Sequence, residues 1–386
     1  MKISRFNNYF MAPDGEKLAF NSYSCGLAVV DSEYEQLMKT LPELDRHNIP
    51  ENLKECYSAA CEGGFIIPDE FDELTDLYTK RNFQKYSIES LGLTIAPTLA
   101  CNFKCIYCYE TSKPGIMDHS VSKKLIEMVE KQADNLRNLS ISWYGGEPLL
   151  AKDIIYSLSE KFIRICDERN IDYSAFIISN GSLLDEEVIK KLIEYRVRGI
   201  QITVDGPPSI HNSRRVNKNG QETFELLINN INKLLETNKI EVVLRINVDK
   251  SNDNDVEKLI QILENKLLNK KVKITFGQVT AYTEACKTIE NNCYDNGEFA
   301  VKMLQYYEIL EKYGFNEYNE FPYPEVKLNY CCAELMNSFV IDPEGYLYKC
   351  WNEVGNVSGA VGNILEEEYD ITSYKNGLWL KRNRLF

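Results

Sequence analysis

Three cysteines, Cys101, Cys105 and Cys108, lie close together in the segment CNFKCIYCYE. Thiolates bind soft metals and iron–sulfur clusters, so this C-x3-C-x2-C spacing indicates a metal or cluster site on a loop. A structural zinc site uses four ligands, often as two C-x2-C pairs. The nearest further ligand is His119, well beyond Cys108. Three thiolates therefore favour a 4Fe-4S cluster with one iron open to a non-protein ligand, and zinc is the alternative.

Glycine-rich and polar turns follow two segments that are expected to be strands. Gly145, Gly146 and Glu147 lie in WYGGEPLL, where the glycines allow the backbone to approach a ligand and the carboxylate suits an ammonium group. Ser179 and Asn180 lie in the next turn of this kind. Taken singly, each pattern is equally typical of a tight turn.

A third turn, in TVDGPPSIHNSRRV, contains Asp205, His211 and Arg215. An arginine there suits a bidentate pair with a carboxylate, and the alternative is a surface arginine near a helix. His211 suits a structural hydrogen bond as well as an acid or base. Arg245 and Asn247 alternate on one face of the following strand.

Strand-like and helix-like segments alternate around these turns. The expected strands are 91–97, 139–144, 173–179, 199–204, 241–248 and 271–276. The expected helices are 121–136, 152–169, 185–195, 223–236 and 253–267. Six such alternations predict the α/β class, with a parallel sheet and helices outside it. Chemistry collects at the carboxyl ends of such strands, where the turns above are found.

The C-x3-C-x-aromatic-C pattern of Cys101, Cys105, Tyr107 and Cys108 resembles the signature of the radical S-adenosylmethionine (SAM) superfamily. The resemblance covers about residues 90–278 and implies a partial (β/α)6 TIM-like barrel. It implies a 4Fe-4S cluster, with SAM chelating the open iron and cleaved by one electron to a 5′-deoxyadenosyl radical. A cellular donor such as flavodoxin or ferredoxin would supply that electron.

The resemblance also assigns contacts with SAM. The GGEP element is expected to hold the amino group of SAM, the polar turn its ribose or carboxylate, and the arginine its carboxylate. The expected cofactor-binding residues are Tyr107, Gly145, Gly146, Glu147, Ser179, Asn180 and Arg215. No protein nucleophile is expected, because the radical abstracts hydrogen from the substrate.

The C-terminal segment NSFVIDPEGYLYKC predicts a β-hairpin bracketed by Cys332 and Cys350. This C-x12-G-x4-C pattern resembles the opening of the auxiliary-cluster domain called SPASM, or its shorter form, twitch. The resemblance implies an auxiliary 4Fe-4S cluster with Cys332 and Cys350 as ligands and Cys331 as a further candidate. No cysteine follows Cys350. We therefore expect a helical linker and an incomplete auxiliary region over 281–386, with the chain truncated or holding a single auxiliary cluster.

Residues 1–85 predict a separate α+β unit ahead of the barrel core at 86–280. A hairpin turning at Asp14 and Gly15 is followed by a third strand, a helix cap near Asp31 and about three helices. This order resembles the winged-helix-like leader-recognition element of peptide maturases, which binds a leader peptide by adding it to a sheet edge. A structural cap on the barrel is the alternative.

Composition narrows the class of protein. The 386 residues include 12 cysteines and carry a formal net charge of −14, which disfavours binding to nucleic acid or to anionic lipid. No signal peptide and no run of about 20 apolar residues is present, so we expect a cytoplasmic protein with reduced cysteines. The dispersed cysteines are expected to be packing residues, although Cys286 and Cys293 could equally be exposed or near a substrate.

We therefore expect a radical SAM oxidoreductase that modifies a ribosomally synthesised precursor peptide with a leader, by a crosslink such as a thioether. An anaerobic sulfatase-maturating enzyme is the alternative, but an aspartate expected to act as base follows the hairpin cysteine in that group, and Trp351 stands here. The alternative from another class is a non-catalytic iron–sulfur or zinc-binding protein.

Overall fold

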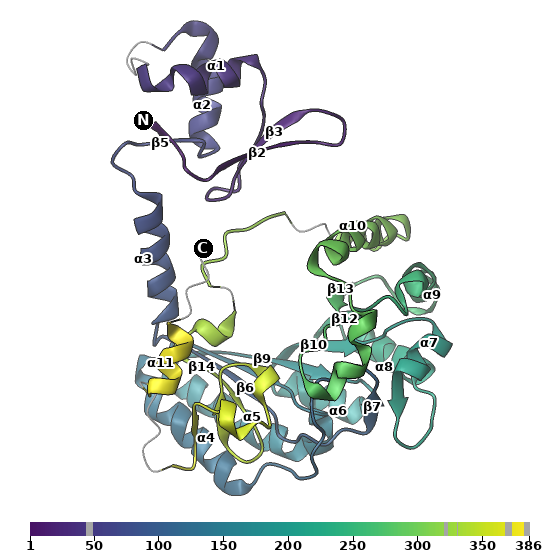
Figure 1. Cartoon of the computed structure of the whole chain (residues 1–386). Helices are drawn as coiled ribbons and strands as arrows, with labels where there is room; N and C mark the ends of the chain where they lie inside the picture. The colour runs from purple at the N-terminus through teal and green to yellow at the C-terminus, as the bar shows by residue number, and fades with distance from the viewer. Residues whose placement is uncertain (44–48, 320–322, 330, 367–372, 382–386) are drawn as a thin grey trace. The chain divides into compact units, whose positions relative to one another are not determined.

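The computed structural model divides the chain into two compact units (Figure 1). The described residues are 1–43, 49–319, 323–329, 331–366 and 373–381, so parts of the expected C-terminal region lie outside them. Unit 1 contains Met1–Lys85 and residues 323–329, and unit 2 contains the other described residues from Tyr86 onward. Each unit encloses buried apolar side chains of its own.

Unit 1 combines short strands with three α-helices. The strands are β1 (Lys2–Ile3), β2 (Asn7–Met11), β3 (Lys17–Asn21), β4 (Leu27–Val29) and β5 (Ile66–Ile67). The helices are α1 (Ser32–Thr40), α2 (Lys54–Glu62) and α3 (Glu73–Lys85). Strands β2, β3 and β4 form an antiparallel sheet in that order, and β1 pairs with β5. Strands β2 and β4 are therefore the two edges of the three-stranded sheet.

Local sequence signals account for how these first elements are joined. Gly15 has a φ of +88°, a conformation that glycine adopts without steric cost, and it lies in the turn between β2 and β3. The Gly15 N–H donates to the carbonyl of Ala12 at 2.9 Å and closes this turn. Asp31 caps α1, because its carboxylate accepts from the N–H of Tyr34 at 2.8 Å.

Unit 2 is built on one nine-stranded sheet of order β13-β12-β10-β9-β8-β6-β14-β15-β16. Neighbouring strands from β13 to β14 are parallel. The first six in sequence are β6 (Ser90–Ile95), β8 (Asn138–Trp143), β9 (Asp172–Ser179), β10 (Val197–Thr203), β12 (Glu241–Val248) and β13 (Val272–Gln278). These are the six strands predicted from the sequence, within a few residues at each end.

Helices connect and cover these strands (Figure 1). They are α4 (His119–Gln132), α5 (Lys152–Arg169), α6 (Glu186–Glu194), α7 (Pro208–Arg214), α8 (Phe224–Thr237), α9 (Val256–Lys266), α10 (Asn296–Lys312) and α11 (Tyr374–Leu380). The apolar faces of α4, α5, α6, α8 and α9 are buried with the strands in one core. The α/β class and the partial barrel are confirmed, since the described strands form an open sheet.

The C-terminal hairpin extends the barrel sheet. It consists of β14 (Ser338–Ile341) and β15 (Tyr346–Tyr348), with the short β16 (Gly362–Asn363) beyond. Strand β14 pairs in parallel with β6, the first barrel strand. The sequence predicted the hairpin but not this pairing, because alternation within a hairpin does not identify the strand beside it. In the described part of the chain, no helix is long and apolar enough to cross a membrane.

Candidate active site at the cysteine loop

A two-stranded antiparallel ladder holds the cysteine loop. Strand β7 (Phe103–Cys105) pairs with β11 (Arg215–Asn217), and Arg215 lies opposite Cys105. The N–H of Ile106 donates to the carbonyl of Arg214 at 3.0 Å and extends the contact. The loop that follows β6 is therefore attached to the segment that follows β10, far away in the sequence.

The three loop thiols lie in one neighbourhood, with Cys101 and Cys105 half-buried and Cys108 exposed at its edge. Burial raises the pKa of Cys101 to about 11 and that of Cys108 to about 12, and it also raises the pKa of Cys105. The charges of Cys101 and Cys105 raise the pKa of Cys108 further. Thiols in such surroundings ionise when a cation stabilises the thiolates. The donor set therefore suits a soft metal centre.

The Sγ of Cys101 also accepts from the N–H of Phe103 at 3.3 Å, as a metal-bound thiolate commonly does. Among the described residues, no three His, Cys, Asp or Glu side chains are spaced to hold a single metal ion. A 4Fe-4S cluster takes its thiolates on separate irons, and so does not require that spacing.

The glycine pair after β8 packs directly against the segment that enters the cysteine loop. A Cβ on Gly145, whose φ is +110°, would lie 2.3 Å from the carbonyl oxygen of Thr98, and a Cβ on Gly146 would lie 2.4 Å from that of Ala100. The N–H of Glu147 donates to Ala100 at 2.9 Å. From the sequence, we expected these glycines to let the backbone approach a ligand. The close approach in the structure is to the chain itself, so the glycines position the loop.

Glu147 joins this turn to the polar turn after β9. Its carboxylate is fully buried and accepts from Ser179 Oγ at 2.8 Å, the Asn180 N–H at 2.7 Å and the Leu149 N–H at 3.1 Å. Burial raises its pKa, and these hydrogen bonds oppose the rise. Asn180 Nδ2 lies 3.9 Å from the Sγ of Cys101. The structure thus brings three predicted site residues together beside one loop cysteine.

A second network surrounds Tyr107, the aromatic residue of the cysteine motif. Its hydroxyl donates to the carboxylate of Asp205 and accepts from Arg215 at 2.7 Å and from Asn247 Nδ2 at 3.2 Å. Burial raises the pKa of Tyr107 well above its usual value. The phenol therefore stays protonated and acts as a fixed connector between the ends of β10 and β12.

Arg214 is a residue of this network that the sequence analysis missed. Its guanidinium donates to the carboxylate of Asp249 at 3.1 and 2.9 Å, and it lies over the ring of Tyr107, 5.2 Å from the centroid. The segment SRRV contains two adjacent arginines, but the sequence analysis assigned a role in the site only to Arg215. Arg214 forms a buried ion pair that fixes Tyr107, whereas Arg215 is the arginine that lies opposite a cysteine.

Arg215 retains donor capacity in this network. It is 8% exposed, one terminal nitrogen donates to Tyr107, and its Nε has no hydrogen-bond partner among the described residues. Buried guanidinium donors are normally satisfied. An unsatisfied donor beside the cysteine loop suits the carboxylate of a ligand.

Two residues left open by the sequence are buried. His211 is fully buried between the N–H of Asp205 and the hydroxyl of Thr223, and burial lowers its pKa to about 3. It is therefore a neutral, structural histidine at physiological pH. Cys286 is also fully buried, in a small apolar cluster that Tyr107 joins. Cys286 is thus a packing residue rather than an exposed thiol.

The hairpin cysteines form a second group. Cys331 and Cys332 begin the loop before β14, and Cys350 follows β15. Burial raises the pKa of Cys332, and the charges of Cys331 and Cys350 raise it further, which places the three thiols in one neighbourhood. The ring of Trp351, the next residue, lies 5.2 Å from the ring of Tyr144, which precedes the glycine pair.

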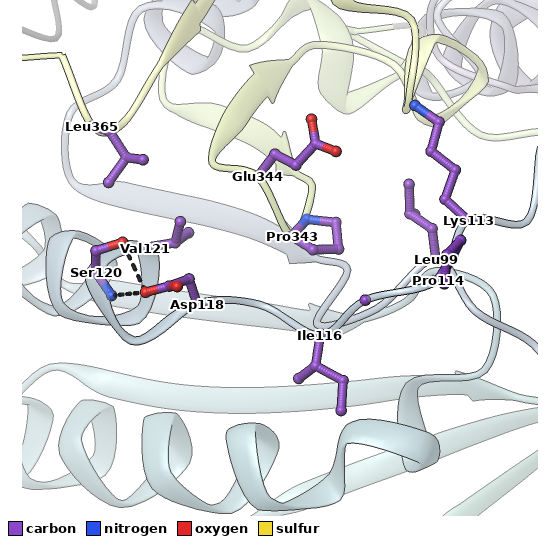
Figure 2. A pocket seen from close by; sticks show the side chains of 11 residues that line it. Leu99, Lys113, Pro114, Ile116, Asp118, Ser120, Val121, Pro343, Glu344 and Leu365 are labelled. Carbon is purple, nitrogen blue, oxygen red and sulfur yellow. Dashed lines mark hydrogen bonds between the residues drawn. The ribbon is translucent and has the colours of Figure 1, made fainter.

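The structure also contains a pocket of about 380 Å³ beyond the cysteine loop (Figure 2). Figure 2 shows Pro343 and Glu344 of the hairpin turn facing the segment that leads into α4. There, Asp118 accepts from the N–H and the hydroxyl of Ser120 and caps the helix. None of the site residues predicted from the sequence lines this pocket. The pocket is therefore separate from the candidate site.

Comparison with known families agrees with this arrangement. The model of the radical SAM superfamily matches residues 95–263. This segment is a radical SAM domain. The matched segment contains the cysteine loop, both strand-end turns and the Arg215 ladder. A 4Fe-4S cluster and SAM are the cofactors that a radical SAM domain implies.

A curated relative matches nearly half of the chain. The cysteine-type anaerobic sulfatase-maturating enzyme of Clostridium novyi (strain NT) is 25% identical over 188 residues, which cover 46% of this chain and 49% of that protein. The chain spans about half the length of the curated relatives it matches.

Two solved structures share the fold. Native anSMEcpe with bound AdoMet and Kp18Cys peptide has a TM-score of 0.62 at 23% identity, covering 76% of this chain and 83% of that one. Streptococcus suis SuiB bound to precursor peptide SuiA has a TM-score of 0.55 at 15% identity, covering 98% of this chain and 88% of that one.

The residues present fit these cofactors. The three clustered thiols are free of disulfides and lie beside amide donors, and Arg215 offers an unsatisfied donor next to them. The fully buried carboxylate of Glu147 accepts only from neutral donors in its hydrogen bonds. A nearby ammonium group would stabilise such a carboxylate.

Proposed function

We propose that this radical SAM protein is an oxidoreductase that modifies a ribosomally synthesised peptide, with a thioether crosslink as the expected product. The observation that carries the proposal is the contact between Trp351 and Tyr144. It packs the end of the hairpin, with its second group of thiols, against the turn that positions the cysteine loop. A thiol-binding group beside the SAM site suits an enzyme that joins a sulfur to carbon.

The cysteines of the loop and their neighbours have separate roles. Cys101, Cys105 and Cys108 hold the 4Fe-4S cluster, and Asn180 and the Phe103 amide stabilise one thiolate. When bound, the cluster and SAM supply a 5′-deoxyadenosyl radical that removes a hydrogen atom from the substrate.

The neighbouring residues position SAM. The turn of Gly145, Gly146 and Glu147 receives its amino group, Ser179 shapes that turn, and Arg215, oriented by Tyr107, pairs with its carboxylate. An external donor such as flavodoxin or ferredoxin supplies the electron. Cys332 and Cys350, with Cys331, would hold the auxiliary cluster, which would supply a site for a substrate thiolate or for the second electron.

We assign leader-peptide recognition to the edge strand β4 of unit 1. Leu27 and Val29 are about half exposed, at 51% and 49%, and offer apolar contacts at this edge. Gly26 and Val30 use their backbone groups to pair with β3, so by alternation the Val29 N–H points away from the sheet. That N–H is available to an added peptide strand. The SuiB structure, which contains a precursor peptide, supports this class of substrate.

A backbone substitution tests this assignment. Val29→Pro removes the outward N–H without removing a bond to β3. It should weaken binding of a candidate precursor peptide, chosen from short reading frames beside the gene, at least tenfold, measured by fluorescence anisotropy. Val29→Thr keeps the N–H and should bind nearly normally. SAM cleavage without peptide should persist in both variants. Unchanged affinity in Val29→Pro would favour the structural-cap interpretation of unit 1.

The alternative activity is sulfatase maturation, which the relative from Clostridium novyi supports. The two candidates differ in the fate of sulfur. A thioether keeps the cysteine sulfur and loses two hydrogen atoms, whereas conversion of cysteine to formylglycine loses the sulfur. Mass spectrometry of the neighbouring precursor peptide and of a cysteine-containing sulfatase peptide, each incubated with reductant and SAM, distinguishes the two outcomes.

A further inference from the structure

Lys349, the residue before Cys350, is a lysine buried beside the hairpin thiols. It is 1% exposed, and its Nζ donates to the carbonyl oxygens of Leu335 at 2.5 Å and Ser338 at 2.7 Å. It also lies 4.5 Å from the centroid of the Phe339 ring. These contacts fix the position of the ammonium group between the two ends of the hairpin.

The hydrogen-bond partners of Lys349 are neutral. Carbonyl oxygens satisfy the donors of a buried ammonium group, but they do not supply a negative charge. Burial lowers the pKa of Lys349 to about 7, and negative charge on Cys332 and Cys331 opposes that fall and favours the ammonium form. Arg214, another buried cation of unit 2, pairs instead with the carboxylate of Asp249. Lys349 therefore lies where anionic thiolates would balance the charge of its ammonium group.

We propose that Lys349 is the counter-charge of an anionic iron–sulfur–thiolate site at Cys331, Cys332 and Cys350. Lys349 is a positioning residue that acts through the cluster and does not touch the substrate. A nearby fixed cation stabilises the more negative, reduced form of a cluster and so raises its reduction potential. This deepens the proposed function and rests on its auxiliary site, because a cluster with a higher potential is better suited to accept the second electron.

The test uses the full chain with Cys101, Cys105 and Cys108 all changed to Ala, so that bound iron reports the hairpin site. This protein is reconstituted anaerobically with ferrous iron and sulfide. Iron content is measured, and the reduction potential is titrated by EPR spectroscopy. Lys349→Gln removes the charge but keeps N–H donors, and Lys349→Met removes both. Lys270→Gln is the matched control, because Lys270 also donates to a carbonyl, that of Tyr313, and lies over an aromatic ring.

We expect the background protein, which carries the three Cys→Ala changes and an unaltered Lys349, to retain iron and sulfide. Lys349→Gln and Lys349→Met should both shift the potential to more negative values or lose the iron, and Lys270→Gln should do neither. Circular dichroism checks that each variant is folded. An unchanged potential in Lys349→Gln, or an effect confined to Lys349→Met, would show that Lys349 serves only as a hydrogen-bond donor and would overturn the inference.

A background protein that binds no iron also overturns it. That result leaves the proposed radical chemistry standing if the unaltered chain still forms 5′-deoxyadenosine from SAM, so the two failures are distinguishable.

Discussion

Arg215 lies directly opposite Cys105 in the β7–β11 ladder, and its guanidinium donates to the hydroxyl of Tyr107 at 2.7 Å. One short antiparallel pairing therefore places a buried cation beside the cysteine loop and orients it through the aromatic residue of the same motif. In a radical SAM domain this relationship fixes the cluster ligands and the expected carboxylate partner of SAM with respect to each other.

Arg215→Gln should weaken SAM binding. A hydrogen bond to a charged group contributes about 1.5–3 kcal/mol, so we expect affinity to fall on the order of 10- to 100-fold, measured by equilibrium dialysis with the reconstituted protein. The control is Arg196→Gln, because Arg196 forms an exposed ion pair with Asp167. Wild-type SAM affinity in Arg215→Gln would remove Arg215 from the binding site.

Gly146→Ala should disturb the cysteine loop. The new Cβ would lie 2.4 Å from the carbonyl oxygen of Ala100, so the backbone must shift. We expect a loss of stability of about 1–3 kcal/mol in urea unfolding, together with lower iron content after reconstitution. Gly377→Ala is the control, since its Cβ meets nothing within 4 Å. Normal stability and normal iron content in Gly146→Ala would contradict the role of this turn in positioning the cysteine loop.

His211 should make stability fall in mild acid. Burial, with a contribution from the charge of Arg215, holds its folded-state pKa at about 3, below the value of about 6.5 in the unfolded chain. Below pH 6.5 the unfolded state takes up a proton that the folded state does not, so stability is lost as pH falls from 6.5 towards 3.

The His211 contribution can be isolated by substitution. Between pH 7.5 and 5.5, wild-type protein should lose about 1.4 kcal/mol more stability than His211→Gln, measured by urea unfolding. His119→Gln is the control for the loss of a histidine elsewhere in the chain. Equal pH dependence in wild type and His211→Gln would mean that the histidine is accessible to protons in the folded protein.

The sequence predicted the parts of the fold that depend on local patterns. Apolar alternation located the six barrel strands, and Asp31 marked a helix start because its carboxylate accepts from an N–H group in the first turn. The cysteine spacing located the candidate cluster loop without any knowledge of the fold.

The contacts that the sequence missed join segments far apart in the chain. The pairing of β7 with β11 depends on two three-residue strands with no alternation of their own. The position of β14 beside β6 is set by a free sheet edge rather than by a motif. The sequence analysis singled out the glycine pair. It did not identify the carbonyl groups of Thr98 and Ala100 that pack against the pair, because they belong to another segment. Spacing along one segment does not identify such partners.

The most direct test of the account is the yield of 5′-deoxyadenosine from SAM after anaerobic reconstitution and reduction, with iron measured on the same samples. Wild-type protein should form 5′-deoxyadenosine, and Cys105→Ala should form none and lose about one cluster's worth of iron. Cys166→Ala is the control, because Cys166 is a fully buried packing residue of α5, and it should retain both properties. Equal 5′-deoxyadenosine formation in Cys105→Ala and wild type would contradict the assignment of the cysteine loop.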